Sequence, residues 1–225
     1  MGRENSTLDW DKDIYGRGRQ LNKWPFTDVV SRFSREISEW ESESAPKVLE
    51  VGCGAGNNLW ALSDLGFDAY GIDISPTVIS FARERFSSQG LPVKLEVGSM
   101  SELPYEKNYF DFVLDRAAVT QVPLDEVSGC VSELARVLKP QGKLFCYTLF
   151  GENHSHRSYG QLQSNGSYDF FTDGIFTKVG MTSFFSQQSI SELFQPFECL
   201  EIIRRLAIHG NDEVFEEYDL IATPR

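Results

Sequence analysis

The stretch Val48-Leu-Glu-Val-Gly-Cys-Gly-Ala-Gly-Asn57 decides the fold of this chain. A short apolar run ends in three alternating glycines, which permit a tight turn and let ligand atoms approach the backbone closely. A helical pattern follows from Asn57 to Leu65 and stops at Gly66. The stretch therefore predicts a strand, a glycine loop and a helix, with a ligand bound at the loop.

A carboxylate at the end of the second predicted strand complements this loop. Asp73 closes the strand Asp68–Asp73 and lies seventeen residues after Gly56. In doubly wound folds, a carboxylate at this strand end accepts hydrogen bonds from the ribose hydroxyls of a bound nucleoside. The loop and Asp73 together predict a nucleoside site.

The spacing of the glycines and an acidic neighbour discriminate between nucleosides. A dinucleotide fingerprint reads G-x-G-x-x-G, whereas this loop reads Gly52-x-Gly54-x-Gly56 with Asn57 in the sixth place. Glu50, just before the loop, would repel a pyrophosphate and attract the ammonium group of an amino acid. The pattern favours cationic S-adenosylmethionine (SAM) over a nicotinamide dinucleotide.

Strands and helices alternate along the rest of the chain. Further strands are predicted at 93–97, 110–114, 143–149, 197–207 and 217–223, and helices at 28–40, 76–88, 125–138 and 189–194. Such alternation produces right-handed crossovers and a mainly parallel sheet. We expect an α/β fold, a doubly wound, mainly parallel, seven-stranded sheet of Rossmann-like type with helices on both faces.

The length and composition indicate one main domain with two appended segments. Residues 28–225 are expected to form that single domain, and residues 1–27 an N-terminal strap or lid. Residues 151–188 are rich in Ser, Gly, Phe and Asn, and follow the fifth predicted strand. Because such loops often carry function, we predict that 151–188 is a substrate-covering insertion.

Charge and cysteine usage narrow the class of partner. The net charge is −12, from 33 acidic and 21 basic side chains, which disfavours a nucleic acid partner. Met1 to Asp13 lacks the apolar core of a signal peptide, and no stretch reaches the ~20 apolar residues of a membrane span. We therefore expect a cytoplasmic protein without a membrane partner. Reduced thiols are expected at four widely spaced cysteines: Cys53, Cys130, Cys146 and Cys199.

Four motifs resemble, in order, those of class I SAM-dependent methyltransferases that act on small molecules. Val48–Gly56 resembles motif I and Gly71–Ser75 resembles motif II. Gly98–Asp111 is similar to the segment that contacts adenine, and Leu134–Leu144 to the helix end, turn and start of the fifth strand. The resemblance covers about residues 45–150. It implies an enzyme that transfers a methyl group to oxygen, nitrogen or carbon of a small acceptor and releases S-adenosylhomocysteine (SAH).

Position by position, the resemblance assigns ten residues to the cofactor: Glu50, Gly52, Gly54, Asn57, Asp73, Ile74, Ser99, Met100, Asp115 and Arg116. The loop and Glu50 would hold the methionine end, and Asp73 the ribose. Ile74 would pack on the adenine, bordered by Ser99 and Met100. Many relatives have Asp where Ser99 stands, so we expect a weaker hydrogen bond to the adenine amino group here.

The stretch after the fourth predicted strand is expected at the ligand-binding edge of the sheet. Asp115 and Arg116 would lie near the methionine moiety. Arg116 could equally pair with an anionic group of SAM or of the substrate, or with Asp111 or Asp125. Gln121 stands where similar methyltransferases often have His, which removes one candidate base.

The N-terminal segment and the region after the fifth strand supply the remaining candidates. In the segment, Tyr15 or Trp24 would shield the sulfonium and Arg19 would meet the methionine carboxylate, unless the segment is only an aromatic strap on the core. His154 and His156 are candidate general bases, with ordinary loop histidines as the alternative. No carboxylate or cysteine cluster accompanies them, so no metal is expected.

Two other functions remain open at this point. One is a nicotinamide-dependent oxidoreductase on the same type of fold, and the other is a non-catalytic module that binds SAM. The acceptor, the methylated atom and the oligomeric state are left open by the sequence.

Overall fold

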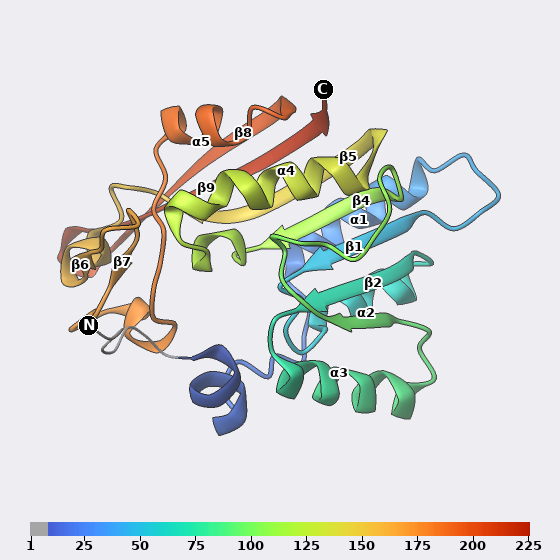
Figure 1. Cartoon of the computed structure of the whole chain (residues 1–225), viewed down its shortest axis with the longest axis horizontal. Helices are drawn as coiled ribbons and strands as arrows, with labels where there is room; N and C mark the ends of the chain where they lie inside the picture. Colours follow the sequence, from blue (N-terminus) through green and yellow to red (C-terminus); the bar gives the residue numbers. More distant parts are fainter. Residues whose placement is uncertain (1–8) are drawn as a thin grey trace.

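One seven-stranded sheet forms the centre of the computed structural model, which describes residues 9–225 apart from the side chain of Asn211 (Figure 1). Its strands are β1 Lys47–Val51, β2 Asp68–Asp73, β3 Lys94–Val97, β4 Phe110–Arg116, β5 Leu138–Phe150, β8 Phe197–His209 and β9 Glu213–Pro224. They lie in the order β3-β2-β1-β4-β5-β9-β8. β1 to β5 are parallel and β9 is antiparallel to both its neighbours. The predicted fold class is confirmed.

Five α-helices and several short turns connect the strands. The helices are α1 Thr27–Ser38, α2 Asn57–Asp64, α3 Pro76–Gln89, α4 Val127–Val137 and α5 Gln187–Leu193. Of the shorter elements, η1 is a π-helical turn, η2 to η7 are 3-10 turns, and β6 and β7 form a separate hairpin. Their bounds are η1 Trp10–Ile14, η2 Tyr15–Arg17, η3 Val119–Gln121, η4 Leu124–Glu126, η5 Ser155–Tyr159, β6 Gln161–Leu162, β7 Tyr168–Asp169, η6 Ile175–Lys178 and η7 Gly210–Asp212.

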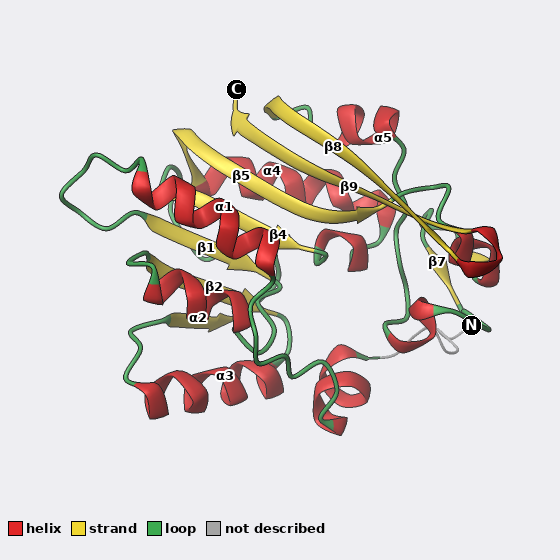
Figure 2. Ribbon diagram, turned by 180° about the vertical axis from the view of Figure 1, so that it is seen from behind, coloured by secondary structure: helices red, strands yellow, loops and turns green. Residues whose placement is uncertain are grey.

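The helices cover both faces of the sheet because successive strand residues alternate between two cores. In β1, Val48 packs with α1, α2 and α3, whereas Leu49 and Val51 pack with α4 and α5. Figure 2 shows α1 and α2 in front of the sheet and α4 behind it. On the first face, Phe33 of α1 makes edge-to-face contacts with neighbouring rings, including Phe145 at 4.9 Å.

Two local features differ from the sequence predictions. The local pattern predicts a first helix from residue 28, but α1 begins at Thr27 and Phe26 occupies its cap position without a side-chain hydrogen bond. The predicted helix and strand leave residues 139–142 outside any element, but these residues belong to β5, which begins at Leu138 and changes register with β4 after Phe110. Pairing with the distant strand β4 extends β5 beyond its local pattern.

The N-terminal segment, residues 9–26, is bound to the carboxyl side of β2. The Oδ1 atom of Asp11 accepts a hydrogen bond from the Ser75 hydroxyl at 2.5 Å. The guanidinium of Arg85, on α3, donates to the carbonyl of Lys23 at 2.7 Å. Hydrogen bonds to residues more than sixty positions away place this segment beside the glycine loop (Figure 1).

Residues 151–186 lie outside the seven-stranded sheet, between β5 and α5. They contain η5, the hairpin of β6 and β7, and η6. The segment packs around Phe176, which is fully buried and lies 4.9 Å from Phe150 and 5.1 Å from Phe184 between ring centroids. Among the helices of residues 9–225, none has the length and apolar character needed to cross a membrane.

Candidate functional site

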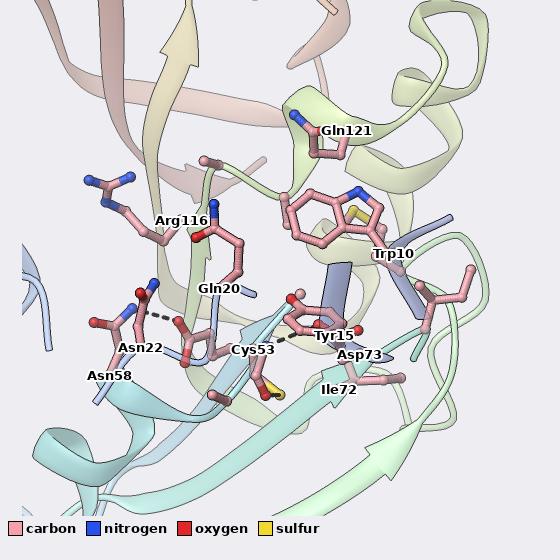
Figure 3. Close-up of a pocket in the computed structure, with 18 of the residues that line it drawn as sticks. Trp10, Tyr15, Gln20, Asn22, Cys53, Asn58, Ile72, Asp73, Arg116 and Gln121 are labelled. Carbon is pink, nitrogen blue, oxygen red and sulfur yellow. Dashed lines mark hydrogen bonds between the residues drawn. The ribbon is translucent and has the colours of Figure 1, made fainter. Parts of the chain in front are cut away.

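A pocket of about 340 Å³ opens at the carboxyl ends of β1, β2 and β4 (Figure 3). Doubly wound folds bind their ligands at this edge, where the strand order reverses. Its walls come from the N-terminal segment, the glycine loop, the ends of β2 to β5 and the insertion: Trp10, Tyr15, Gln20, Asn22, Phe26, Glu50, Gly52, Cys53, Gly54, Ala55, Asn57, Asn58, Ile72, Asp73, Ile74, Gly98, Ser99, Met100, Arg116, Ala117, Ala118, Gln121, Val122, Phe150 and Val179.

The glycine loop forms the floor of this pocket because its backbone requires residues without a side chain. Gly52, Gly54 and Gly56 have φ values of +60°, +51° and +73°, in the left-handed region that favours glycine. A Cβ at Gly52 would lie 2.3 Å from the Cβ of Ala118, and one at Gly56 would lie 2.6 Å from the ring of Phe86. The spacing seen in the sequence therefore reflects both conformation and close packing.

Asp73 ends β2 and lies beside the loop. Its Oδ2 atom accepts from the Gly54 N–H and its Oδ1 atom from the Ser75 N–H, both at 2.9 Å. Burial raises the pKa of Asp73, while these two backbone donors oppose the increase. The carboxylate is thus oriented at the pocket wall with lone pairs left to accept further hydrogen bonds.

Glu50 lies in the pocket wall with one carboxylate oxygen unpartnered. The side chain is 2% exposed, and Asn58 donates to its Oε1 atom at 2.7 Å. Its Oε2 atom has no hydrogen-bond partner among the described residues. Burial is the main cause that raises the pKa of Glu50 to about 8, and the negative charges of Asp115 and Asp73 add smaller increases. A cation that reached Oε2 would favour the ionised carboxylate and satisfy a buried polar atom.

The wall near the end of β2 and β3 is apolar with one hydroxyl. Ile74 lines the pocket and exposes 67% of its surface, which leaves the side chain free to pack against a flat ring. Met100 and Ser99 lie beside it in the wall, and the Ser99 hydroxyl is 2.8 Å from that of Ser101.

Asp115 does not line the pocket, contrary to the prediction. It is fully buried and accepts from the N–H groups of Ala118 and Val119 at 3.0 Å, and the Cys146 thiol donates to it at 3.0 Å. Burial raises the pKa of Asp115 to about 6. Its role is to hold the loop after β4 in place, because all its contacts are within the protein.

Arg116 lines the pocket as predicted, with partners different from those proposed. Its Nε atom is 3.7 Å from Oδ2 of Asp28, and its guanidinium lies 4.0 Å from the centre of the Phe26 ring. Asp111, one alternative partner, pairs instead with Lys139 at 2.7 Å. A stacked, ion-paired arginine is held rigidly at the pocket wall.

Of the three N-terminal candidates, only Tyr15 lines the pocket. It is buried, and a Cβ at Gly54 would lie 3.1 Å from its hydroxyl oxygen. Trp24 does not line the pocket, because its ring is turned outward and is 69% exposed, with the Lys23 ammonium over it. Arg19 lines a neighbouring cavity instead.

His154 and His156 lie outside the pocket, so the structure contradicts their prediction as bases. Both are buried in the insertion, where the His154 ring stacks on Phe215 at 4.6 Å. The Nδ1 atom of His156 accepts from the Ile175 N–H, and its Nε2 atom is 3.4 Å from a Glu213 carboxylate oxygen. Burial lowers the pKa of His154 to about 4. These histidines organise the insertion.

In a second part of the pocket, sequence reasoning selected no individual cofactor-binding or catalytic residue, although it placed the stretch before Gln121 at this edge of the sheet and predicted an N-terminal strap or lid. Trp10, Gln20, Gln121, Val122, Phe150 and Val179 line it from four separate segments. Figure 3 shows Trp10 and Gln121 across the pocket from Cys53 and Asp73. Oriented with its amide nitrogen toward the main chain, Gln121 donates to the carbonyls of Val179 and Met181. The only local signal was position, since Val122 and Phe150 follow or end predicted strands.

Comparison with known proteins finds a family match for the central part of this chain. Residues 49–146 match the family model described as methyltransferase domain. The ubiquinone biosynthesis O-methyltransferase of Roseobacter denitrificans is 30% identical over 135 residues, which are 59% of this chain and 52% of that protein. The demethylmenaquinone methyltransferase of Bacillus mycoides is 35% identical over 137 residues, 56% of each chain. This chain spans about half the length of these curated relatives.

A solved structure supports the same fold. The crystal structure of a SAM-dependent methyltransferase from Methanosarcina mazei aligns with a TM-score of 0.69 and 24% identity. The alignment covers 84% of this chain and 96% of that protein. The likeness extends beyond the family-model match, so the β9 and β8 end of the sheet also follows the methyltransferase architecture.

Proposed function

We propose that this chain is a class I SAM-dependent methyltransferase, an enzyme that transfers the methyl group of SAM to oxygen, nitrogen or carbon of a small molecule. The match of residues 49–146 to the methyltransferase domain supports the proposal. The observation that carries the proposal is the buried, unpartnered Oε2 atom of Glu50 beside the glycine loop. A buried carboxylate of this kind matches a cationic amino-acid tail and opposes a pyrophosphate. The chemistry of the curated relatives, which their names give as O-methylation and quinone methylation, is consistent with it.

The residues around the loop fit the parts of SAM. Glu50 would accept from the ammonium group, and Gly52 and Gly54 leave room for the methionine chain close to the backbone. Asp73 would accept from the ribose hydroxyls, and the exposed Ile74 would pack on the adenine. The remaining contacts proposed for the donor come from Tyr15, Asn57, Ser99, Met100 and Arg116, all of which line the same pocket.

SAM supplies a methyl group on a positively charged sulfur, with a neutral leaving group. The protein then has to align the acceptor and exclude water, and such positioning accounts for much of the rate. Trp10, Val122 and Phe150 supply apolar walls for this purpose, and Gln20 and Gln121 supply amides that orient a polar group. In this second part of the pocket, the described residues include no carboxylate, imidazole or thiol. We infer that no side chain acts as general base.

The appended segments are proposed to close this site. The N-terminal segment forms one wall through Trp10 and Tyr15, and the insertion at 151–188 contributes Val179. We treat residues 28–225 as the methyltransferase domain. The four cysteines are free, and with the net charge of −12 they support a cytoplasmic enzyme that acts on a small molecule and not on nucleic acid.

Calorimetry with SAM, SAH and NADH tests the proposal on the purified chain. We expect binding of SAM and SAH and no heat with NADH. Asp73→Ala should weaken SAH binding by about 10- to 150-fold, because the ribose loses a charged acceptor worth roughly 1.5–3 kcal/mol. Circular dichroism checks that the variant is folded. Absence of binding to both SAM and SAH would refute the assignment.

A further inference from the structure

We propose that the methyl acceptor carries an anionic oxygen group, such as a carboxylate, which Arg19 and Lys178 bind at the mouth of the pocket. The proposal rests on the proposed function, since it concerns the substrate of the same site. It names a substrate class: a flat, apolar body with an acid at the end far from the methylated atom.

The first observation is where the two cations lie. Arg19 and Lys178 line a second cavity together with Gln20, and Gln20 also lines the main pocket. Each cation is followed in the chain by a pocket-lining residue, Gln20 after Arg19 and Val179 after Lys178. Two segments that are about 160 residues apart in sequence therefore bring positive charges to the same edge of the site.

The second observation is that neither cation has a partner within residues 9–225. No ion pair or side-chain hydrogen bond involves Arg19 or Lys178 in this part of the chain. By contrast, Arg17 pairs with Asp13 at 2.9 Å, and Arg116 pairs with Asp28. In a chain with a net charge of −12, two unpaired cations at a pocket mouth attract an anionic ligand.

The third observation is how charge is divided within the pocket. Glu50 and Asp73, the only carboxylates among the described lining residues, belong to the proposed donor side. The same pocket is also lined by Trp10, Phe150 and Val179, which present an apolar surface. An elongated acceptor would thus place its apolar body between these side chains, and its acid would meet cations and no like charge.

The acid is a recognition group and takes no part in the transfer. The acceptor atom contributes an electron pair to the methyl carbon, the carbon–sulfur bond breaks, and its electrons remain on sulfur. A proton released from the acceptor atom passes to solvent, because no side chain on that side serves as base. The anionic group is therefore unchanged in the product.

The test compares an acid with its neutral amide on the SAH-saturated protein. The probes are 6-hydroxy-2-naphthoate and 6-hydroxy-2-naphthamide, with binding measured by calorimetry. We expect the acid to bind at least tenfold more tightly than the amide. The double variant Arg19→Gln, Lys178→Gln should abolish this preference and leave amide binding unchanged. Added salt should reduce the preference in the wild type, because exposed ion pairs are screened.

Arg17→Gln is the matched control, since it removes an equal charge from the same segment at a residue that does not line either cavity. It should retain the preference for the acid. Equal binding of the two probes, no binding of the acid, or a preference that survives in the double variant would overturn the proposal. SAH binding is measured first in each variant: its loss from the wild type would refute the proposed function, whereas SAH binding without a preference for the acid refutes only the anionic acceptor.

Discussion

Replacing Glu50 by Gln should stabilise the fold and weaken cofactor binding at the same time. Burial raises the pKa of Glu50 from its ordinary value near 4.5 to about 8. Between these values the folded state binds a proton that the unfolded state has lost, so the free energy of unfolding decreases as pH rises. At about 1.36 kcal/mol per pKa unit, the full shift corresponds to at most about 5 kcal/mol at pH 8 and above.

Glutamine keeps the size of the side chain and an oxygen for the Asn58 amide, which donates to Oε1 at 2.7 Å. Its amide hydrogens lack partners, which costs roughly 1–3 kcal/mol. We therefore expect Glu50→Gln to be about 1–3 kcal/mol more stable than the wild type at pH 8.5, and no more stable at pH 5. Urea unfolding at the two pH values measures this difference.

Cofactor binding should respond in the opposite direction. An ammonium group bound to Glu50 favours the ionised form, so binding of SAH below pH 8 should release about one proton. The affinity of the wild type should rise by up to tenfold per pH unit between pH 6 and 8. Glu50→Gln should lose about 10- to 150-fold in affinity, since a hydrogen bond to a charged group contributes roughly 1.5–3 kcal/mol. Calorimetry in two buffers with different ionisation enthalpies counts the protons.

Glu36→Gln provides the control for a buried glutamate. Glu36 is 4% exposed and pairs with Arg32 at 3.1 Å and Lys143 at 2.6 Å. Its substitution should destabilise the protein and leave both SAH affinity and proton release unchanged. Wild-type affinity in Glu50→Gln, or proton release that persists in it, would refute the placement of the ammonium group at Glu50.

Three further outcomes are expected from the geometry of the site and the insertion. Gly52→Ala should abolish SAH binding in calorimetry and lower the melting temperature. The new Cβ would lie 2.3 Å from the Cβ of Ala118, and the φ of +60° at this position favours glycine. Normal binding would contradict the described loop. Trp10 lines the pocket, so Trp10→Ala should slow SAH formation with an accepted substrate at least tenfold. Trp24→Ala is the control, because its ring is exposed, and it should match the wild type. Equal rates in the two variants would show that Trp10 has no role in the site. Burial lowers the pKa of His154 to about 4, so below pH 6.5 the unfolded state binds a proton that the folded state does not. The free energy of unfolding should therefore fall by roughly 2 kcal/mol between pH 6.5 and 5. His154→Phe should reduce this loss in urea unfolding, and a pH profile identical to that of the wild type would contradict the role of His154.

Local patterns alone were sufficient for the elements around the glycine loop. β2 has the predicted bounds, Asp68–Asp73, and Pro76 begins α3 as expected. β1 ends at Val51, directly before the glycine loop, where the sequence predicts the turn. Alternating apolar residues, glycine stops and a proline at the first helical position act over a few residues, so they can be read without the fold. The mainly parallel character of the sheet followed from the alternation of strands and helices.

The positions of isolated polar side chains required the tertiary structure. Asp115 directly precedes Arg116, yet it is buried against the loop after β4 while Arg116 lines the pocket. His154 and His156 follow β5 but turn into the aromatic core of the insertion. Neighbours in a strand or loop point in different directions, and only packing against distant segments decides which of them reaches a ligand.

What the sequence by itself determined is the fold and the part of the pocket around the glycine loop, because these depend on a contiguous glycine loop and a carboxylate at a strand end. Tertiary structure alone decided the rest of the pocket wall, which combines Trp10, Gln121 and Val179 from segments far apart in the chain. No local pattern encodes such a convergence, since it arises from the free energy of packing whole segments together.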